Sequence, residues 1–269
     1  MSETPNLFDT IVRRRSGEAQ AAFGRARIPS QRTPLSEPLR LMMFGSTGML
    51  GRAVMQVTAQ NDAVSLVAVS RREVRLPPGV RMELRLAPTD LWEEVIAQQR
   101  PERIACALGT TMRKAGGDEE AFRAVDERLV LDVARAAKKA GVGQFIFVSA
   151  AGADDASSNF YFKVKGEVER ELSKLHFERL DILRPGLLRG ERIDDRRPGE
   201  RLAAIVSPLT DLALRNRGRR FRSLSAATVA NAILGIGLQK AGGRFVHDHD
   251  AILRAARKFE RALEEVAPS

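Results

Sequence analysis

The sequence has few of the residues on which many functions depend. Its 269 residues include one cysteine, three histidines, one tryptophan and a single tyrosine, Tyr161. One cysteine excludes a disulfide framework and every zinc or iron–sulfur site built from several cysteines. Three histidines argue against a histidine-rich metal centre. Function must therefore rest on a small number of candidate side chains.

Long apolar runs are also absent, and none approaches the roughly 18–20 residues that a membrane-spanning helix needs, so we expect no membrane partner. The first fifteen residues are polar and lack the apolar core of a secretory signal. Glu3, Asp9 and Glu18 count against a transit peptide. Together these features predict a cytoplasmic protein.

Positive charge is in excess, with a formal net charge of +10. The densest run, residues 215–222, has five arginines in eight residues and could meet a phosphate, a nucleic acid or an acidic partner. Only Phe221 could stack on a base, so we interpret the run as a solvated connection. We do not expect a nucleic-acid partner.

The chain changes character near residue 40. Prolines at positions 5, 29, 34 and 38 interrupt residues 1–39, which we interpret as a flexible N-terminal extension. From residue 40 to residue 269, short β-branched-rich runs alternate with helical periodicity. This alternation predicts a single α/β domain with a doubly wound parallel sheet of the Rossmann type. Segments after residue 185 are expected to shape a small C-terminal substrate lobe.

The elements predicted from the pattern cover most of residues 40–269. Strands are expected at residues 40–44, 64–70, 82–87, 103–108, 144–149, 179–184 and 244–247. Helices are expected at residues 50–60, 91–99, 118–140, 159–175, 200–214, 226–238 and 250–265.

A glycine-rich turn follows the first predicted strand. Three glycines spaced three apart suit a dinucleotide pyrophosphate, because they permit a tight turn, a close approach of the ligand and close packing of helix on strand. The free N–H groups at the helix start would face the negative charge. The turn comprises Gly45, Ser46, Thr47, Gly48, Met49, Leu50 and Gly51.

The end of the second strand is where a dinucleotide fold reads the adenosine ribose. An acidic residue there would favour NAD, but this chain has Ser70, Arg71 and Arg72. A hydroxyl and two guanidinium groups can hold a 2′-phosphate, so we predict NADP(H) in preference to NAD(H). The alternative is two surface arginines in an arginine-rich protein.

Tyr161 and Lys165 are four residues apart at the start of a predicted helix, so their side chains share one face. The ammonium should lower the pKa of the phenol, which would make Tyr161 a proton donor or acceptor near neutral pH. Ser149 ends the fifth predicted strand, at the sheet edge where ligands bind. Its hydroxyl could donate a hydrogen bond to a substrate carbonyl beside the tyrosine. We therefore predict Ser149, Tyr161 and Lys165 as catalytic residues.

The glycine turn, Ser149 and the Tyr161–Lys165 pair together resemble the short-chain dehydrogenase/reductase superfamily. The resemblance implies that Asp90 and Leu91 lie by the adenine, and that Arg184, Pro185 and Gly186 lie beside the nicotinamide. Residues 107–111, 157–160 and 164–169 are similar to the atypical branch that contains the Tat-interactive oxidoreductase-like proteins. That branch binds NADP(H), and the resemblance adds four cofactor-binding positions: Leu108, Gly109, Thr110 and Thr111.

One position and one three-residue segment depart from other branches of the superfamily. Ala150 follows Ser149 where several relatives have a second serine. Gly109, Thr110 and Thr111 replace a common Asn-Ala-Gly, which puts the structural asparagine of those branches in doubt.

The resemblance implies an NADP(H)-dependent oxidoreductase that transfers hydride to or from a small carbonyl or enone substrate. Tyr161 would act as acid or base, Ser149 would orient the substrate oxygen, and Lys165 would also hold the nicotinamide ribose. The alternative is an NADPH-binding regulatory protein that controls a protein partner with little or no turnover. The sequence leaves a homodimer open.

Residues 247–250, His-Asp-His-Asp, bring together two residue types that bind metals. No further cluster accompanies them in the sequence, so we predict no metal site. Cys106 lies within a predicted strand and is interpreted as a small buried apolar residue.

Overall fold

The structure is a computed structural model, and it describes residues 38–59, 63–74, 76, 82–190 and 221–266. The chain divides into two units, residues 1–36 and residues 37–269, and the elements below belong to the second unit. Most of the predicted N-terminal extension therefore lies outside the described residues. The predicted helix at residues 200–214 and residues 215–220 of the basic run lie outside them too.

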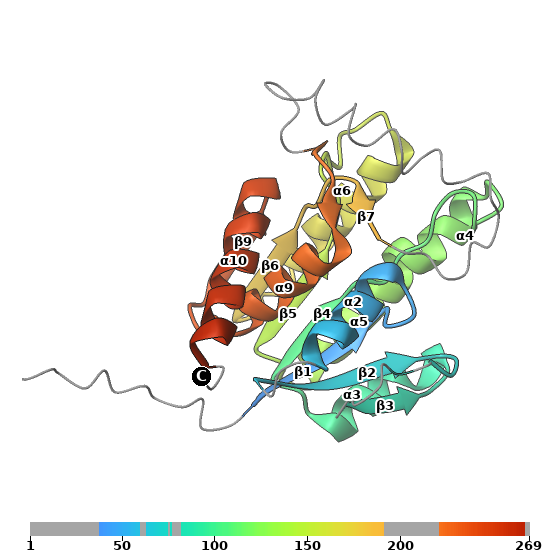
Figure 1. The fold of residues 1–269 in the computed structure, drawn as a ribbon. Coiled ribbons are helices and arrows are strands. Elements are labelled where there is room, and N and C mark those ends of the chain that lie inside the picture. Colours follow the sequence, from blue (N-terminus) through green and yellow to red (C-terminus); the bar gives the residue numbers. More distant parts are fainter. Residues whose placement is uncertain (1–37, 60–62, 75, 77–81, 191–220, 267–269) are drawn as a thin grey trace, which may run out of the picture. The chain divides into compact units, whose positions relative to one another are not determined.

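A seven-stranded sheet forms the centre of the second unit, and each neighbouring pair of strands is parallel (Figure 1). The strand order is β3-β2-β1-β4-β5-β6-β9. The chain reverses its direction of winding between β1 and β4, which confirms the predicted doubly wound parallel sheet. The strands are β1 (Leu39–Phe44), β2 (Val64–Ser70), β3 (Glu83–Leu86), β4 (Arg103–Cys106), β5 (Gln144–Val148), β6 (Arg179–Leu183) and β9 (Gly243–His247).

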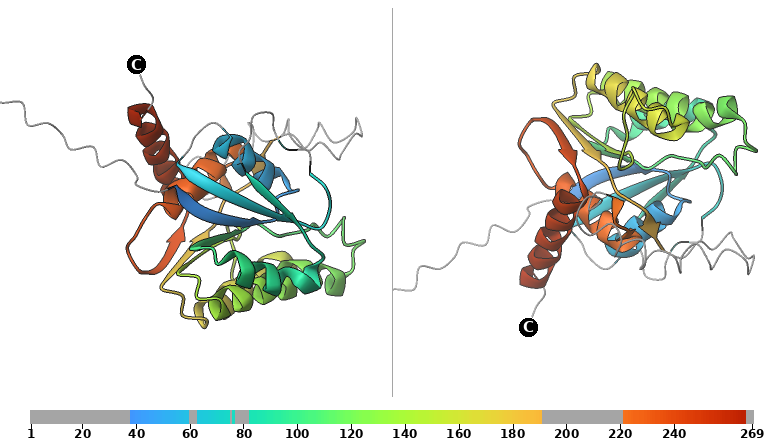
Figure 2. Two further views of the ribbon diagram at one scale, coloured as in Figure 1. Left: turned by 90° about the horizontal axis from the view of Figure 1, so that it is seen from below. Right: turned by 90° about the horizontal axis from the view of Figure 1, so that it is seen from above.

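Helices cover both faces of the sheet (Figure 2). One face carries α2 (Met49–Thr58), α9 (Ala226–Gly237) and α10 (His249–Val266). The other face carries α3 (Trp92–Gln99), α5 (Leu129–Lys139) and α6 (Phe160–Ser173). Successive side chains of a strand point to opposite faces, so Met43 of β1 packs under α2 and α9 whereas Phe44 packs beside Trp92 of α3. Burial on both faces explains why the strands read as continuous apolar runs.

The predicted helix at residues 118–140 is interrupted. It consists of α4 (Glu119–Arg123), a π-helical turn η2 (Ala124–Arg128) and α5. A π turn adds a residue to the helical period and therefore rotates the side chains that precede it relative to those that follow. A short 3-10 helix, η1 (Thr89–Leu91), also precedes α3.

After residue 185 the chain both completes the main sheet and builds a smaller one. Strand β9 extends the main sheet, while β7 (Leu188–Arg189) and β8 (Leu224–Ser225) form a parallel pair of their own. Residues 191–220, which join β7 to β8 and belong to the predicted substrate lobe, lie outside the described residues. Within the described part of the chain, no helix is both long and apolar enough to cross a membrane.

Candidate active site

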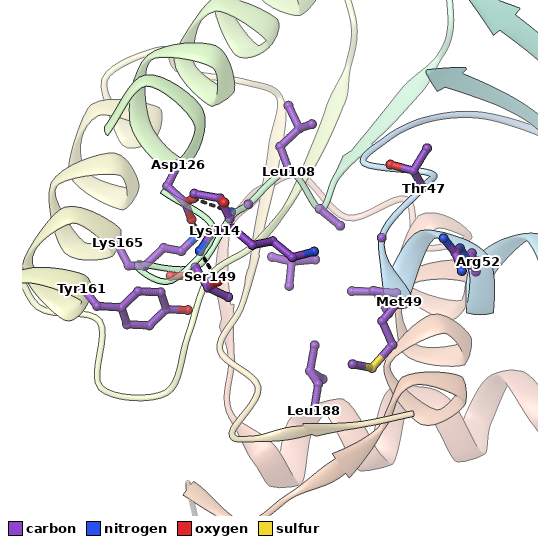
Figure 3. Close-up of a pocket in the computed structure, with 17 residues that line it drawn as sticks. Thr47, Met49, Arg52, Leu108, Lys114, Asp126, Ser149, Tyr161, Lys165 and Leu188 are labelled. Carbon is purple, nitrogen blue, oxygen red and sulfur yellow. Dashed lines mark hydrogen bonds and ion pairs between the residues drawn. The ribbon is translucent and has the colours of Figure 1, made fainter. Parts of the chain in front are cut away.

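A pocket of about 240 Å³ opens at the carboxyl ends of β1, β4 and β5 (Figure 3). Tyr161, Lys165 and Ser149 lie on one side of it, and Thr47 and Arg52 lie on the opposite side. This is the edge at which open α/β sheets bind ligands. The pocket is lined by Thr47, Gly48, Met49, Leu50, Arg52, Ala107, Leu108, Gly109, Thr110, Thr111, Lys114, Asp126, Val148, Ser149, Tyr161, Lys165 and Leu188.

Two glycines make the turn at the end of β1 possible. Gly45 has a φ of +88°, and a Cβ built there would lie 2.5 Å from the carbonyl oxygen of Ala107 on the neighbouring strand end. A Cβ at Gly51 would overlap the Gly45 carbonyl oxygen and the Ser46 backbone. Each position therefore excludes a side chain, for the physical reasons inferred from the spacing.

The N-terminus of α2 lines the pocket through Gly48, Met49 and Leu50. Gly48 is the N-cap residue and provides no side-chain cap, and the first turn of α2 contains no acidic residue. Ser46 is buried, and its hydroxyl donates to the Val69 carbonyl oxygen at 2.9 Å, which ties the turn to β2. Backbone N–H groups, the helix dipole and the nearby Arg52 fit a pyrophosphate at this point.

The segment that follows β2 presents two arginines to solvent. Arg71 and Arg72 are exposed, whereas Ser70 is buried. The Ser70 hydroxyl donates to the Arg72 carbonyl oxygen at 2.6 Å and accepts from the Arg72 N–H at 3.2 Å. Its single proton is used within the turn, so Ser70 stabilises the turn that carries the two guanidinium groups.

Helix α6 brings Tyr161 and Lys165 to the pocket on one face. The helix begins after Asn159, whose side-chain oxygen accepts from the Phe162 N–H at 3.2 Å. The Tyr161 hydroxyl points toward the pocket (Figure 3), and its ring makes an edge contact with Phe122 at 5.9 Å between ring centroids. A single turn of helix thus aligns the phenol with the ammonium.

Lys165 is buried and forms an ion pair with a carboxylate that the sequence did not reveal. Its Nζ lies 2.8 Å from Oδ1 of Asp126, and both residues are almost inaccessible to solvent. The other carboxylate oxygen of Asp126 accepts from the Thr110 N–H at 2.6 Å. Burial alone would lower the pKa of Lys165, but the charge and hydrogen bond of Asp126, together with Tyr161 and Cys106, raise it above its ordinary value.

The expectation of a lowered pKa for Tyr161 is wrong. Burial raises the pKa of the phenol above its ordinary value, and the charge of Lys165, which opposes this, is itself opposed by Asp126. Because the ammonium has a buried counterion, its effect on the pKa of the phenol is partly opposed and does not overcome the effect of burial. Tyr161 is therefore held in its protonated form at neutral pH.

Ser149, directly after β5, lines the pocket but does not direct its proton into it. The Ser149 hydroxyl donates to Oε1 of Glu169 at 2.5 Å, and both residues are buried. The predicted hydrogen bond from Ser149 to a substrate carbonyl therefore has a competitor inside the protein. Arg184 binds the same carboxylate through three N–H···O contacts of 2.5–3.2 Å. This hydrogen bonding raises the pKa of Arg184.

The predicted cofactor residues fall into two groups. Those that line the pocket are Thr47, Gly48, Met49, Leu50, Leu108, Gly109, Thr110, Thr111 and Lys165. Those described but outside its lining are Gly45, Ser46, Gly51, Ser70, Arg71, Arg72, Asp90, Leu91, Arg184, Pro185 and Gly186. Asp90 and Leu91 are exposed near the end of β3, and the Pro185 carbonyl accepts from the Ala151 N–H at 2.8 Å. The Arg184 guanidinium is occupied by Glu169.

Several site residues were missed from the sequence. Glu169 carried a usable signal, because it follows Lys165 by a further four residues on the face that also holds Tyr161. Asp126 carried none, since the π turn that sets its direction was not predicted. The other lining residues that were missed are Arg52, Ala107, Lys114, Val148 and Leu188.

Histidines 247 and 249 are each beside a carboxylate rather than grouped around a common point. His247 Nε2 lies 2.8 Å from Asp181 Oδ1, and His249 Nδ1 lies 3.1 Å from Asp250 Oδ1. Among the described residues there is no group of three or more histidine, cysteine, aspartate or glutamate side chains that could hold a metal. Cys106 is fully buried, which raises the pKa of its thiol to about 12.

The sequence profile of the NAD(P)H-binding family matches residues 45–236, which is more than half of the chain. The chain belongs to the NAD(P)H-binding family. Protein HTATIP2 of Rattus norvegicus is 36% identical over 167 residues, covering 61% of this chain and 68% of that protein. Protein FMP52, mitochondrial, of Meyerozyma guilliermondii is 35% identical over 156 residues, covering 57% and 67%. Protein fmp52, mitochondrial, of Aspergillus fumigatus is 32% identical over 172 residues, covering 61% and 73%.

Solved structures share the fold at lower sequence identity. The UDP-glucose 4-epimerase of Thermus thermophilus in complex with NAD superposes with a TM-score of 0.57 at 17% identity, covering 82% of this chain and 83% of that chain. The Bordetella bronchiseptica enzyme WbmG in complex with NAD gives 0.58 at 18%, covering 88% and 84%. Together with the rat relative, these matches confirm the predicted resemblance to the short-chain dehydrogenase/reductase superfamily.

The predicted cytoplasmic location is contradicted by these relatives. Several curated relatives at 31–37% identity carry the word mitochondrial in their names. The acidic residues Glu3, Asp9 and Glu18 argued only against one kind of import signal, so they did not exclude a mitochondrial location.

Proposed function

We propose that this protein is an NADP(H)-dependent oxidoreductase that transfers hydride between the cofactor and a small carbonyl or enone substrate. One observation carries the proposal. Tyr161, the single tyrosine of the chain, and the buried Lys165 line the same pocket as the glycine turn and the N-terminus of α2. A phenol beside a dinucleotide site has the chemistry of a proton donor for carbonyl reduction.

The residues present fit the cofactor in parts. The turn at residues 47–50 and the N-terminus of α2 would hold the pyrophosphate. Arg71 and Arg72 would hold the 2′-phosphate. The exposed Leu91 and Asp90 would lie by the adenine. Lys165 uses one of its three donors on Asp126, so two remain for the nicotinamide ribose. When bound, NADPH supplies the hydride.

The protonated state of Tyr161 at neutral pH suits the reductive direction. A protonated phenol can transfer its proton to a carbonyl oxygen as negative charge develops there, whereas it is a poor base for an alcohol. Positioned proton transfer of this kind contributes about 10²–10⁴-fold to rate. Lys165 would then stabilise the phenolate that remains, until solvent returns the proton.

The test is NADPH oxidation by the full chain with a panel of aldehydes, ketones and enones. We expect wild-type turnover with at least one compound, and a loss of about 100-fold or more in Tyr161→Phe with NADPH affinity retained. Lys163→Gln, an exposed change on the same helix, is the matched control and should remain active. Turnover that survives in Tyr161→Phe would refute the role of the tyrosine.

A second candidate is an NADPH-binding protein that regulates a partner without turnover. The contacts within the site favour it, because the Ser149 hydroxyl donates its hydrogen bond to Glu169 and the Lys165 ammonium forms an ion pair with Asp126. Tight NADPH binding with no turnover of any compound in the panel, and no difference between wild type and Tyr161→Phe, would support this candidate over the first.

A further inference from the structure

The Ser149 hydroxyl has a single proton, and that proton is already donated within the protein. A serine hydroxyl has a single proton and two lone pairs. Here the proton is donated to Oε1 of Glu169 at 2.5 Å, within the buried interior. What remains for a ligand in the pocket is the oxygen with its lone pairs, which can only accept a hydrogen bond.

Arg184 fixes the position of the Glu169 side chain that accepts this hydrogen bond. The guanidinium donates through its Nε and Nη2 to both carboxylate oxygens of Glu169. The Glu169 side chain is only 3% exposed, whereas that of Arg184 is 33% exposed. Water therefore reaches the arginine but not the carboxylate, and Ser149 is the buried donor on its other side.

We propose that Glu169, clamped by Arg184, is a positioning residue that fixes the Ser149 hydroxyl as a hydrogen-bond acceptor toward the pocket. The site then takes a carbonyl substrate that bears a neighbouring hydroxyl group. This inference rests on the proposed function. The carbonyl oxygen receives its proton from Tyr161, and the neighbouring hydroxyl donates to Ser149 Oγ. The lining of the pocket also includes the apolar residues Val148 and Leu188.

A matched pair of substrates tests the proposal. Acetoin (3-hydroxybutan-2-one) and butan-2-one differ by one hydroxyl beside the carbonyl. Wild type should reduce acetoin with kcat/KM about tenfold or more above that of butan-2-one, expressed mainly in KM, which is the effect of one hydrogen bond. Glu169→Gln removes the charge that holds the Ser149 proton, so the preference should fall to within about twofold.

Three further variants separate positioning from folding. Ser149→Ala should lose the same preference, and in combination with Glu169→Gln it should add no further change in the ratio, because both act through one oxygen. Glu169→Asp keeps a charge opposite Arg184 but withdraws it by one methylene, so it should also lose the preference while remaining folded. Glu171→Gln, a half-buried carboxylate on the same helix, is the matched control and should keep the ratio.

A second measurement does not depend on turnover. In a Ser149→Cys variant the new thiol would occupy the serine position, and the only native cysteine, Cys106, is fully buried. The Glu169 carboxylate should suppress formation of the thiolate. Adding Glu169→Gln should raise the rate of alkylation by iodoacetamide about tenfold near pH 7, and adding Glu171→Gln should not.

The outcomes are distinct. If wild type reduces neither ketone nor any compound of the wider panel, the proposed function fails, while the alkylation rates still decide whether Glu169 controls position 149. The inference itself is overturned if Glu169→Gln lowers kcat/KM equally for both ketones and leaves the ratio of the two values unchanged. That is the result expected of a residue with a structural role alone. It is overturned as well if the alkylation rate of the double variant, Ser149→Cys with Glu169→Gln, is within twofold of the rate of Ser149→Cys alone.

Discussion

Replacing Asp126 by asparagine should destabilise the protein strongly, because Asp126 is the buried counterion of Lys165. The Lys165 Nζ and the Asp126 Oδ1 are 2.8 Å apart, with side chains only 4% and 1% exposed. At an effective dielectric constant of ~20 their attraction is about 6 kcal/mol, most of which offsets the cost of taking both charges out of water. Asparagine keeps an acceptor for the Thr110 N–H but removes the charge. We expect a loss of about 3–5 kcal/mol in the free energy of unfolding.

The assay is chemical unfolding followed by the fluorescence of Trp92, the only tryptophan, which is 4% exposed. A loss of this size corresponds to a fall of roughly 10 °C in Tm for a domain of this length. Asp132→Asn is the matched control, because Asp132 forms an exposed ion pair with Arg135 at 3.1 Å and should matter little. The double variant Asp126→Asn with Lys165→Met removes both charges and should recover much of the stability.

The pH dependence follows from the raised pKa of Lys165. A raised pKa in the folded state means that the contribution of the pair is fully present below the ordinary value of 10.5 and is lost as pH rises through the folded value. The stability difference between wild type and Asp126→Asn should therefore narrow only above about pH 10.5. A free energy of unfolding for Asp126→Asn within about 1 kcal/mol of wild type near pH 7 would contradict this role of Asp126, as would a double variant no more stable than the single one.

Three further predictions concern the cofactor and the titrating groups. Replacing both Arg71 and Arg72 by glutamate should lower the affinity for NADPH about tenfold or more at fixed salt and change the affinity for NADH by no more than about twofold. Both affinities are measured by fluorescence titration. Equal losses of affinity for the two cofactors would show that the arginines do not bind the 2′-phosphate. Because Tyr161 is the only tyrosine, phenolate absorbance reports it alone, and its midpoint should lie above 10.0; Lys165→Met should raise it further, and a midpoint below 10.0 would contradict the structure. The thiol of Cys106, with a pKa of about 12, should resist alkylation near pH 8 until the chain unfolds; rapid alkylation of the folded protein would show that it is accessible.

Much of the fold could be predicted from the sequence because its signals are local. Strand β2 was predicted with its observed bounds, since Val64–Ser70 is a short apolar run between polar breaks. The turn at Gly45 and Gly51 followed from spacing, because the backbone there admits no side chain. Tyr161 and Lys165 share a face for the same kind of reason, a fixed helical period.

The electrostatics of the site could not be predicted, because they depend on contacts far apart in the sequence. Asp126 forms an ion pair with Lys165, which is 39 positions later in the sequence. Asp126 lies in a π turn that no residue pattern predicted. Burial raises the pKa of Tyr161, and the Asp126 carboxylate adds to this rise by opposing the effect of Lys165. Likewise, the direction of the Ser149 proton depends on Glu169 and on Arg184, which come from different elements. Periodicity predicts which face a side chain lies on, but not which charge it meets there.

We propose that this pocket transfers hydride from NADPH with Tyr161 as the proton donor. This is tested by mass spectrometry of the product formed from a ketone that wild type reduces and NADPH that carries deuterium at both C4 positions of the nicotinamide. We expect one deuterium in the wild-type product and a rate lower by about 100-fold or more in Tyr161→Phe. The proposal is contradicted if NADPH binds but no compound of the panel acquires deuterium, or if Tyr161→Phe transfers deuterium as fast as wild type.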